Sequence, residues 1–333
     1  MRHDASLKSL GEFGFIDRIA RRAPDGSGVV LGIGDDAAAV APSAGNLTLI
    51  TTDMLVEGIH FDLAFCDAFS LGRKALSVNL SDIAAMGGTP RHALLSLAVP
   101  PSVDLALLDD MLQGMMQRAA EFGVSLIGGD TCSSPDRMVL SLTVLGEQLP
   151  ERIVRRSGAC PGDAVCVTGT LGDSALGLQL LKKGDRDGFL IARHLDPTPR
   201  VREGRALADA ALPSAMIDLS DGLLADLQHI LDSSSVGARL RMADIPLSPA
   251  FREKLPAMSE EARCLALSGG EDYELLFSVP PSRMSALRSV MQETGTPLAV
   301  IGVITETKRL AVADADGIEL PLQTKGFDHF AGS

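Results

Sequence analysis

Glycine and aspartate recur side by side along this 333-residue chain. The first instance is "GIGDDAAAV" at 32–40, in which Asp35 and Asp36 are adjacent. Adjacent carboxylates repel one another and fit poorly in a packed core, whereas a turn rich in glycine and aspartate is a common way to end a strand. A single pair therefore does not distinguish a functional site from an ordinary turn. The pattern returns as "GGD" at 128–130, "LGD" at 171–173, "LSDG" at 219–222 and "GGED" at 269–272.

The stretch "AMIDLSDGLLADLQHIL" (215–231) predicts a strand that turns sharply into a helix. Asp218 falls at the end of the strand, where a sheet usually opens onto its ligand site. Ser220 and Asp221 fall in the first turn of the helix. One interpretation is that either residue caps the helix, a position that serine and aspartate favour. Capping leaves Asp218 unexplained, so a ligand site is an open alternative.

Two hydroxyls and a carboxylate stand in a row at the end of another predicted strand, on Thr51, Thr52 and Asp53. They indicate either a ligand site or an edge strand with polar side chains facing water. Asp82 lies in a helix whose neighbouring residues are apolar. A charge in such surroundings should be paired or bound to a metal, unless this face of the helix is solvated.

Glycine precedes polar residues in two further stretches. In "LIGGDTCSS" Gly129 and Asp130 follow a strand, and glycines there let the backbone come close to a ligand or simply form a turn. The glycine-rich "VTGTLGDSALGL" (167–178) is either a loop that cradles phosphate or the start of a helix. Sequence alone leaves both alternatives open.

Taken together, these aspartates favour a metal site. If they converge they cannot do so alone, since two like charges ~4 Å apart repel by ~4 kcal/mol at an effective dielectric of about 20. Mg²⁺ with carboxylate and phosphate ligands would relieve this repulsion. The predicted site therefore binds a polyphosphate through Mg²⁺. The residues concerned are Asp36, Asp53, Asp82, Asp130, Asp218 and Asp221.

Charge and composition exclude several classes of function. The formal net charge of −13 argues against nucleic acid and anionic membranes as partners. Five cysteines without a C-x-x-C pair predict neither a zinc site nor a disulfide framework. The sequence has no apolar run of membrane-spanning length and its first residues do not resemble a signal peptide, so we expect a cytoplasmic protein. The motifs of P-loop proteins, protein kinases and G-x-S-x-G hydrolases do not occur.

The order of elements predicts an α+β or mixed α/β protein of two domains, 1–150 and 151–333, joined near "RRSGACPGDAVCVTG". The first domain mixes strands and helices, and the second begins with a new strand. Apolar and β-branched runs predict strands, and helical periodicity ended by glycine predicts helices. The strands are expected at 47–56, 92–100, 124–130, 138–147, 215–218, 273–280 and 298–305, and the helices at 71–87, 103–123 and 283–293.

These motifs resemble the thiamine-monophosphate kinase family, whose superfamily also includes aminoimidazole ribonucleotide synthetase and selenophosphate synthetase. The resemblance covers nearly the whole chain and keeps the order of the motifs. A small departure is Cys132, which stands where a second threonine is common. The matching stretches are "GEFGFIDRI", "GIGDDAA", "TTDMLVEGIHF", "KALSVNLSDIAAMGGTP", "IGGDT", "RSGACPGD", "RHLDPTPR", "AMIDLSDGL", "LSGGEDYELLF" and "KGFDHF".

The resemblance implies that ATP phosphorylates thiamine monophosphate, with several Mg²⁺ ions around the phosphates. It implies a homodimer in which the mixed sheets of the N-terminal domains, with helices on one face, pair into a barrel. The N-terminal domain would bind ATP and Mg²⁺ and form the dimer, and the C-terminal domain would complete the site. The implied metal ligands are Asp36, Thr51, Thr52, Asp53, Asp82, Asp130, Asp218 and Asp221. The implied ATP contacts are Gly129, Asp130, Arg156 and Ser220, and the implied substrate contacts are His60, Glu271 and Phe327.

Other interpretations stay open at this point. The same scaffold could serve an ATP-dependent synthetase or cyclase, or a sensor that binds nucleotide without turnover. His60 could be a polar loop residue, and Phe327 could only pin the C-terminal tail to its domain. No catalytic base is assigned, because the oxygen of a phosphate acceptor is already anionic and direct in-line transfer needs positioning and charge neutralisation.

Overall fold

The computed structural model describes residues 7–34, 36–255 and 259–321. Its residues form two compact units, of which the N-terminal unit comprises the chain up to Ile83 together with Thr89–Pro150. The C-terminal unit comprises Ala84–Gly88 and the chain from Glu151 onwards. No helix in the described part of the chain is both long and apolar enough to cross a membrane. The roles predicted for the two domains remain predictions.

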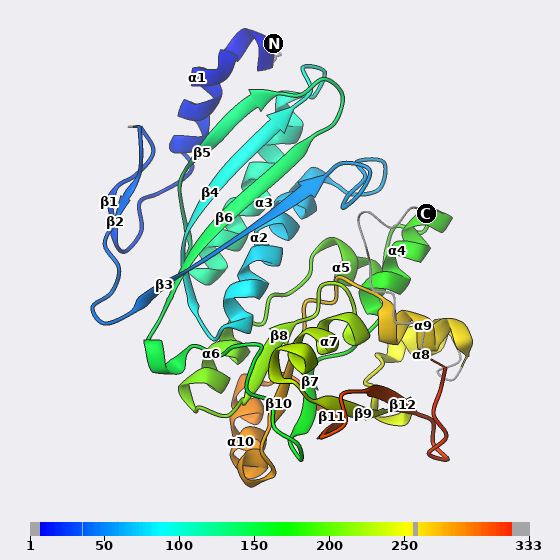
Figure 1. The fold of residues 1–333 in the computed structure, drawn as a ribbon. Helices are drawn as coiled ribbons and strands as arrows, with labels where there is room; N and C mark the ends of the chain where they lie inside the picture. Colours follow the sequence, from blue (N-terminus) through cyan, green and yellow to red (C-terminus); the bar gives the residue numbers. More distant parts are fainter. Residues whose placement is uncertain (1–6, 35, 256–258, 322–333) are drawn as a thin grey trace. The chain divides into compact units, whose positions relative to one another are not determined.

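A four-stranded sheet in the order β3-β6-β4-β5 forms the centre of the N-terminal unit. Strands β4 and β5 pair in parallel, and the other neighbours pair antiparallel. Helices α2 and α3 cover one face of this sheet, and α1 lies near β5 (Figure 1). The bounds are α1 Leu7–Ala20, β1 Val29–Leu31, β2 Ala39–Val40, β3 Leu47–Val56, α2 Ala68–Ala85, β4 Thr89–Val99, α3 Leu105–Phe122, β5 Ser125–Ser133 and β6 Val139–Gln148.

Side chains alternate between the two faces of β3, as its sequence requires. Leu49 and Leu55 point toward the helices and are 7% and 3% exposed. Ile50 and Met54 point to the other face and are 69% and 57% exposed. One face of the sheet is therefore packed on the core, and the edge strand β3 exposes large apolar side chains on the other. The aspartate Asp53 lies on the helix-facing side, since it shares the parity of Leu49 and Leu55.

The close approach of α2 and α3 depends on two glycines. A Cβ atom on Gly72 would collide with the carbonyl oxygen of Met111, and one on Gly114 would collide with the carbonyl oxygen of Phe69. Both glycines lie within regular helix, where the residue costs about 0.5–1 kcal/mol relative to alanine. The backbones meet at these positions, which holds α2 closely against α3.

The C-terminal unit contains a six-stranded sheet in the order β12-β9-β11-β7-β10-β8, in which β12 and β9 pair in parallel and the other neighbours antiparallel. Its core joins side chains of α4, α7 and α9 to the sheet, among them Leu176, Leu227 and Ala266. The strands are β7 Ala164–Thr168, β8 Ala215–Asp218, β9 Gly237–Arg241, β10 Leu275–Val279, β11 Leu298–Thr305 and β12 Leu310–Ala313. The helices are α4 Asp173–Lys183, α5 Phe189–Leu195, α6 Val201–Asp209, α7 Leu223–Ser234, α8 Pro249–Lys254, α9 Glu260–Ser268 and α10 Met284–Thr294.

The mixed α/β architecture agrees with the prediction, and each strand and helix predicted in the N-terminal unit is present within a few residues of its expected bounds. The predicted pairing of two such sheets into a barrel concerns a second chain and remains a prediction.

Candidate functional site

Strand β3 and helix α2 bring a hydroxyl and two carboxylates together. The Thr51 hydroxyl donates a hydrogen bond to the carboxylate of Asp82. Burial, followed by the negative charge of Asp82, raises the pKa of Asp53 to about 7. The fully buried Asn79 fixes this strand to the helix, because its Oδ1 accepts the backbone N–H of Asp53 at 3.1 Å. All these groups offer oxygen, and two mutually repelling carboxylates suit a hard divalent cation.

Thr52 lies on the opposite face of β3 from this group. Its hydroxyl donates to the carbonyl oxygen of Leu142 at 3.0 Å and accepts a hydrogen bond from Thr143 at 3.2 Å. The alternation of side chains along a strand separates Thr52 from Thr51 and Asp53. The structure therefore groups Thr51 with Asp53 and Asp82, and it does not bring the Thr52 hydroxyl to them.

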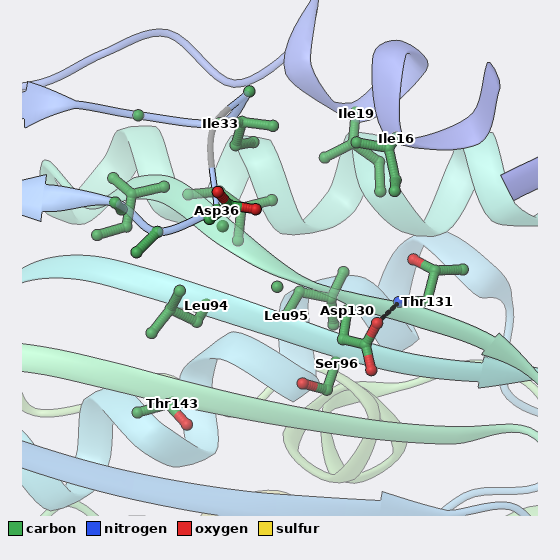
Figure 2. A pocket seen from close by; sticks show the side chains of 18 of the residues that line it. Ile16, Ile19, Ile33, Asp36, Leu94, Leu95, Ser96, Asp130, Thr131 and Thr143 are labelled. Atoms are coloured by element: carbon green, nitrogen blue, oxygen red, sulfur yellow. Dashed lines mark hydrogen bonds between the residues drawn. The ribbon is translucent and has the colours of Figure 1, made fainter. Parts of the chain in front are cut away.

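A pocket of about 940 Å³ lies in the N-terminal unit between α1, the loop 32–38 and the sheet (Figure 2). Its apolar lining includes Ile16 and Ile33, and the carboxylates of Asp36 and Asp130 both lie in it. Asp130 accepts the backbone N–H of Thr131 at 2.9 Å, and its side chain is exposed. The pocket offers apolar side chains that could contact a flat ring, and two carboxylates, one from the loop and one from β5.

Glycine is required beside Asp130. Gly129 has a φ of 152°, and a Cβ atom there would collide with the backbone carbonyl of Leu95 on β4. This close approach of β5 to β4 explains the second glycine of "GGD" as a packing requirement. A predicted contact of the Gly129 backbone with ATP remains a prediction.

The "LSDG" loop of the C-terminal unit differs from the prediction in one respect. Asp218 ends β8 as expected and is 4% exposed. Helix α7 begins only at Leu223, and its N-cap is Gly222. Ser220 and Asp221 precede the helix, so their predicted place in its first turn and their predicted capping role are wrong. Both side chains are half-exposed.

Asp226 takes over the capping role. One carboxylate oxygen of this 2%-exposed residue accepts the backbone N–H groups of Ser220, Asp221 and Gly222 at 3.0, 3.1 and 3.1 Å. Burial, followed by the charge of Asp221, raises the pKa of Asp226 to about 7. The carboxylate folds back from the first turn of α7 and satisfies the loop, which leaves the side chains of Ser220 and Asp221 available for other partners.

The "LSDG" and "GGED" loops are joined through their backbones. The N–H of Glu271 donates to the carbonyl oxygen of Ser220 at 2.8 Å, and the N–H of Tyr273 donates to that of Leu219 at 2.9 Å. Glu271 and Tyr273 have φ values of 66° and 51°, in the left-handed region that non-glycine residues rarely occupy. A residue implied to contact ATP and a residue implied to contact substrate are therefore neighbours.

The glycine-rich stretch at 167–178 begins a helix. The fully buried carboxylate of Asp272 accepts the backbone N–H groups of Gly172 and Ser174 at 2.6 and 3.2 Å, at the start of α4. Burial raises the pKa of Asp272 to about 7. Because this carboxylate occupies N–H groups that a phosphate would need, the structure favours a helix start over a phosphate cradle.

The remaining predicted residues lie at the ends of elements or outside the described residues. His60 is half-buried after β3, and its Nδ1 accepts the backbone N–H of Val56 at 3.0 Å. Arg156 is exposed in the loop before β7. Phe327 lies outside the described residues, as does Asp35. The substrate and ATP contacts of these residues remain predictions.

Seven of the eight predicted metal ligands fall into three groups, and Thr52 lies apart from the first of them on the other face of β3. Among residues 7–34, 36–255 and 259–321, no three His, Cys, Asp or Glu side chains lie together in a way that could hold a metal ion. A cation at any of these groups would need further ligands, and phosphate oxygens and water are the usual ones for Mg²⁺. The groups are Thr51 with Asp53 and Asp82, which interact directly, Asp36 with Asp130, which line one pocket, and Asp218 with Asp221, which are neighbours only in sequence at the end of β8.

Family models match both halves of the chain. Residues 34–148 match the AIR synthase related protein N-terminal domain, and residues 160–315 match the corresponding C-terminal domain. The chain therefore has the two-domain architecture of the AIR synthase related proteins. A hydrogenase maturation protein of Escherichia coli, HypE, has the same fold at 19% identity and a TM-score of 0.79.

Individual relatives identify the family to which this chain belongs among the AIR synthase related proteins. Thiamine-monophosphate kinase of Escherichia coli O157:H7 is 42% identical over 331 residues, which cover 97% of this chain and 99% of the relative. The crystal structure of thiamine-monophosphate kinase from Stenotrophomonas maltophilia K279a is 38% identical, with a TM-score of 0.82, and covers 91% of this chain and 96% of its own. This chain belongs to the thiamine-monophosphate kinase family.

Proposed function

We propose that this protein transfers the γ-phosphate of ATP to thiamine monophosphate, which yields thiamine diphosphate and ADP. One observation carries the proposal. The chain is 32% identical, with a TM-score of 0.76, to AaThiL complexed with AMPPCP and TMP, and the match covers 97% of this chain and 98% of the other. AMPPCP is an analogue of ATP in which the transferable phosphate cannot leave, so that complex holds a phosphate donor and a second ligand together.

The donor set of the N-terminal unit fits Mg²⁺ on the chemistry of its atoms. Asp53 and Asp82 face each other closely enough that the charge of Asp82 raises the pKa of Asp53, and Thr51 adds a hydroxyl. Bound Mg²⁺ would neutralise part of the phosphate charge and reduce the repulsion between the phosphates of donor and acceptor. We propose the three groups of ligands named above, together with Thr52, as the residues that hold several such ions.

The chain's own residues position the reactants. The apolar pocket beside Gly129 and Asp130 would take the nucleotide base, and Ser220 and Arg156 would contact ATP. As the resemblance implies, Glu271, His60 and Phe327 would each contact thiamine monophosphate. The acceptor oxygen is anionic, so no residue has to remove a proton from it, and transfer in line without a covalent intermediate on the protein is the simplest route.

We propose that the protein acts as a homodimer. The face of the N-terminal sheet opposite α2 and α3 carries Ile50 and Met54, which are 69% and 57% exposed on β3. Large apolar side chains on an edge strand favour burial against a partner. Pairing of this face with that of a second chain would form the barrel predicted from sequence. The cytoplasmic location expected from sequence stays a prediction.

Product analysis tests the proposed activity. The protein is incubated with Mg²⁺, ATP and thiamine monophosphate, and the products are separated by chromatography. We expect thiamine diphosphate and ADP in equal amounts. ADP formation without thiamine diphosphate would indicate a different acceptor, as in a synthetase or cyclase. Nucleotide binding without any ADP formation would indicate a sensor, and either result would overturn the proposal.

A further inference from the structure

The stretch "RHLDPTPR" (193–200) has no role in the function proposed so far, yet its side chains converge on the "GGED" loop. Arg193 donates to the carbonyl oxygen of Asp272 at 3.0 Å and to Glu274 at 2.8 Å. Arg200 donates twice to the carboxylate of Glu274, at 2.6 and 2.5 Å. The two arginines therefore hold the segment 272–274 from the side of α5 and α6.

Glu274 is the centre of this contact and is fully buried. Besides the two arginines, the hydroxyl of Thr168 donates to it at 2.7 Å. A buried carboxylate with this many donors is costly to disturb, since loss of one partner leaves a buried charge uncompensated. The cluster thus keeps the backbone rigid next to two residues, Glu271 and Tyr273, that have positive φ.

The third contact of the stretch reaches Glu271 itself. Nδ1 of His194 lies 3.3 Å from a carboxylate oxygen of Glu271 and 3.1 Å from the hydroxyl of Ser174. The His194 side chain is 4% exposed, whereas that of Glu271 is 27% exposed. The carboxylate therefore has one side toward a buried imidazole and another side toward solvent. Its backbone is fixed independently, through the N–H that donates to Ser220.

We propose that His194 is a positioning residue for thiamine monophosphate, which it orders by holding the carboxylate of Glu271 in the direction of the substrate. This inference rests on the proposed function. A carboxylate repels the phosphate of the substrate, so the part of thiamine that Glu271 faces is a cationic or hydrogen-donating one, either the thiazolium ring or the amino group of the pyrimidine. His194 acts on this substrate through Glu271, and ATP is bound by other residues.

A matched pair of variants tests the proposal. Leucine and asparagine have nearly the same shape, and the amide nitrogen of asparagine can take the place of Nδ1 while leucine has no donor. His194→Leu removes the 3.3 Å contact between Nδ1 and the carboxylate of Glu271 and should raise the KM for thiamine monophosphate about 3-fold or more. The KM for ATP should change less than about 2-fold. His194→Asn should recover most of the affinity, since it restores an N–H at the position of Nδ1.

A double-mutant cycle shows whether His194 acts through Glu271. In the Glu271→Gln background, His194→Leu should have little further effect on the KM for thiamine monophosphate. The proposal is overturned by additive effects in the cycle, by equal increases in both KM values, by unchanged KM values, or by an Asn variant as impaired as the Leu variant. Failure of the proposed function is a separate result, because the wild-type protein would then form no thiamine diphosphate.

A measurement on the wild-type protein covers the case in which the variants do not fold. The chain has six histidines, so the imidazole NMR signals can be resolved and followed during titration. We expect the imidazole assigned to His194, rather than that of the equally buried His92, to shift on addition of thiamine monophosphate and to stay unchanged on addition of AMPPCP alone. The absence of such a shift at saturating thiamine monophosphate would contradict the proposal.

Discussion

The role of Asp226 can be tested through the three backbone N–H groups that it satisfies. Asp226→Leu keeps the approximate shape of the side chain and removes the acceptor. Of the three donors, that of Gly222 is buried, while Ser220 and Asp221 are half-exposed and can turn toward water. A buried N–H without a partner costs about 1–3 kcal/mol, so we expect a loss of about 1–3 kcal/mol in the free energy of unfolding.

Activity should respond as well, because Asp226 fixes the loop that carries Ser220 and Asp221. We expect Asp226→Leu to raise the KM for ATP about 10-fold or more, and Asp226→Asn, which keeps an oxygen acceptor, to cost about 1 kcal/mol of stability. Urea denaturation at pH 5, below the raised pKa of Asp226, and steady-state kinetics measure the two effects. Asp232→Asn on the exposed side of the same helix is the control, with an expected change within about 0.5 kcal/mol. Wild-type stability and an unchanged KM for ATP in Asp226→Leu would refute this account of the loop.

Three further predictions concern other parts of the chain. Burial raises the pKa of Asp272 to about 7 in the folded protein, from 3.8 in the unfolded chain. The contribution of Asp272 to stability is therefore fully present below about pH 3.8 and is lost as the pH rises through 7. Asp272→Asn should therefore flatten the fall of the urea midpoint between pH 5 and pH 8, and an unchanged slope would contradict the assignment. Asp53→Asn should abolish most activity. In the absence of Mg²⁺ it should also raise the melting temperature, by about 2–4 °C for each kcal/mol of repulsion with Asp82 that it removes. A lower melting temperature would mean that this carboxylate stabilises the fold. Gly114→Ala should lower the free energy of unfolding by at least about 2 kcal/mol, because the new Cβ meets the backbone of α2. The control is Gly123→Ala, at a φ of 66° with open space around it, which should cost about 1 kcal/mol. Equal losses would show that backbone strain, rather than the helix contact, sets the cost.

Local sequence patterns predicted the long strands of both sheets and the helices α2, α3, α7 and α10, but not α1, β1 or β2. The alternating and apolar runs of the N-terminal unit identified its long strands, and glycine marked the ends of α2 and α3. Two strands of the C-terminal unit, β9 and β12, were missed. Both are short, and they are added at one edge of a sheet that other strands form, where they pair in parallel with each other. Their conformation depends on that sheet more than on their own residues.

The candidate site was predicted in part. The sequence identified Thr51, Asp53 and Asp82 as residues to consider, and the structure places them together. The sequence analysis did not separate Thr52 from them, although side chains alternate along a strand and Thr52 therefore lies on the other face of β3.

The buried carboxylates of the C-terminal unit could not be predicted from local rules. Asp226 was missed because Ser220 and Asp221 fit the cap position better by residue type, while the chain bends there to pair with the "GGED" loop. Asp272 and Glu274 were missed because their donors are remote, with Arg200 74 positions away in sequence from Glu274. A carboxylate surrounded by partners so distant along the chain looks like a surface residue in a single sequence.

The most direct test of the central claim is a single-turnover experiment with γ-labelled ATP, in which the enzyme exceeds ATP and thiamine monophosphate is saturating. Samples are quenched over time and separated into protein, nucleotide and thiamine phosphates. Direct in-line transfer predicts that label appears in thiamine diphosphate at the rate at which it leaves ATP, with none retained on the protein. Label that passes through the protein as a competent intermediate, or that is released as inorganic phosphate without thiamine diphosphate, would contradict it.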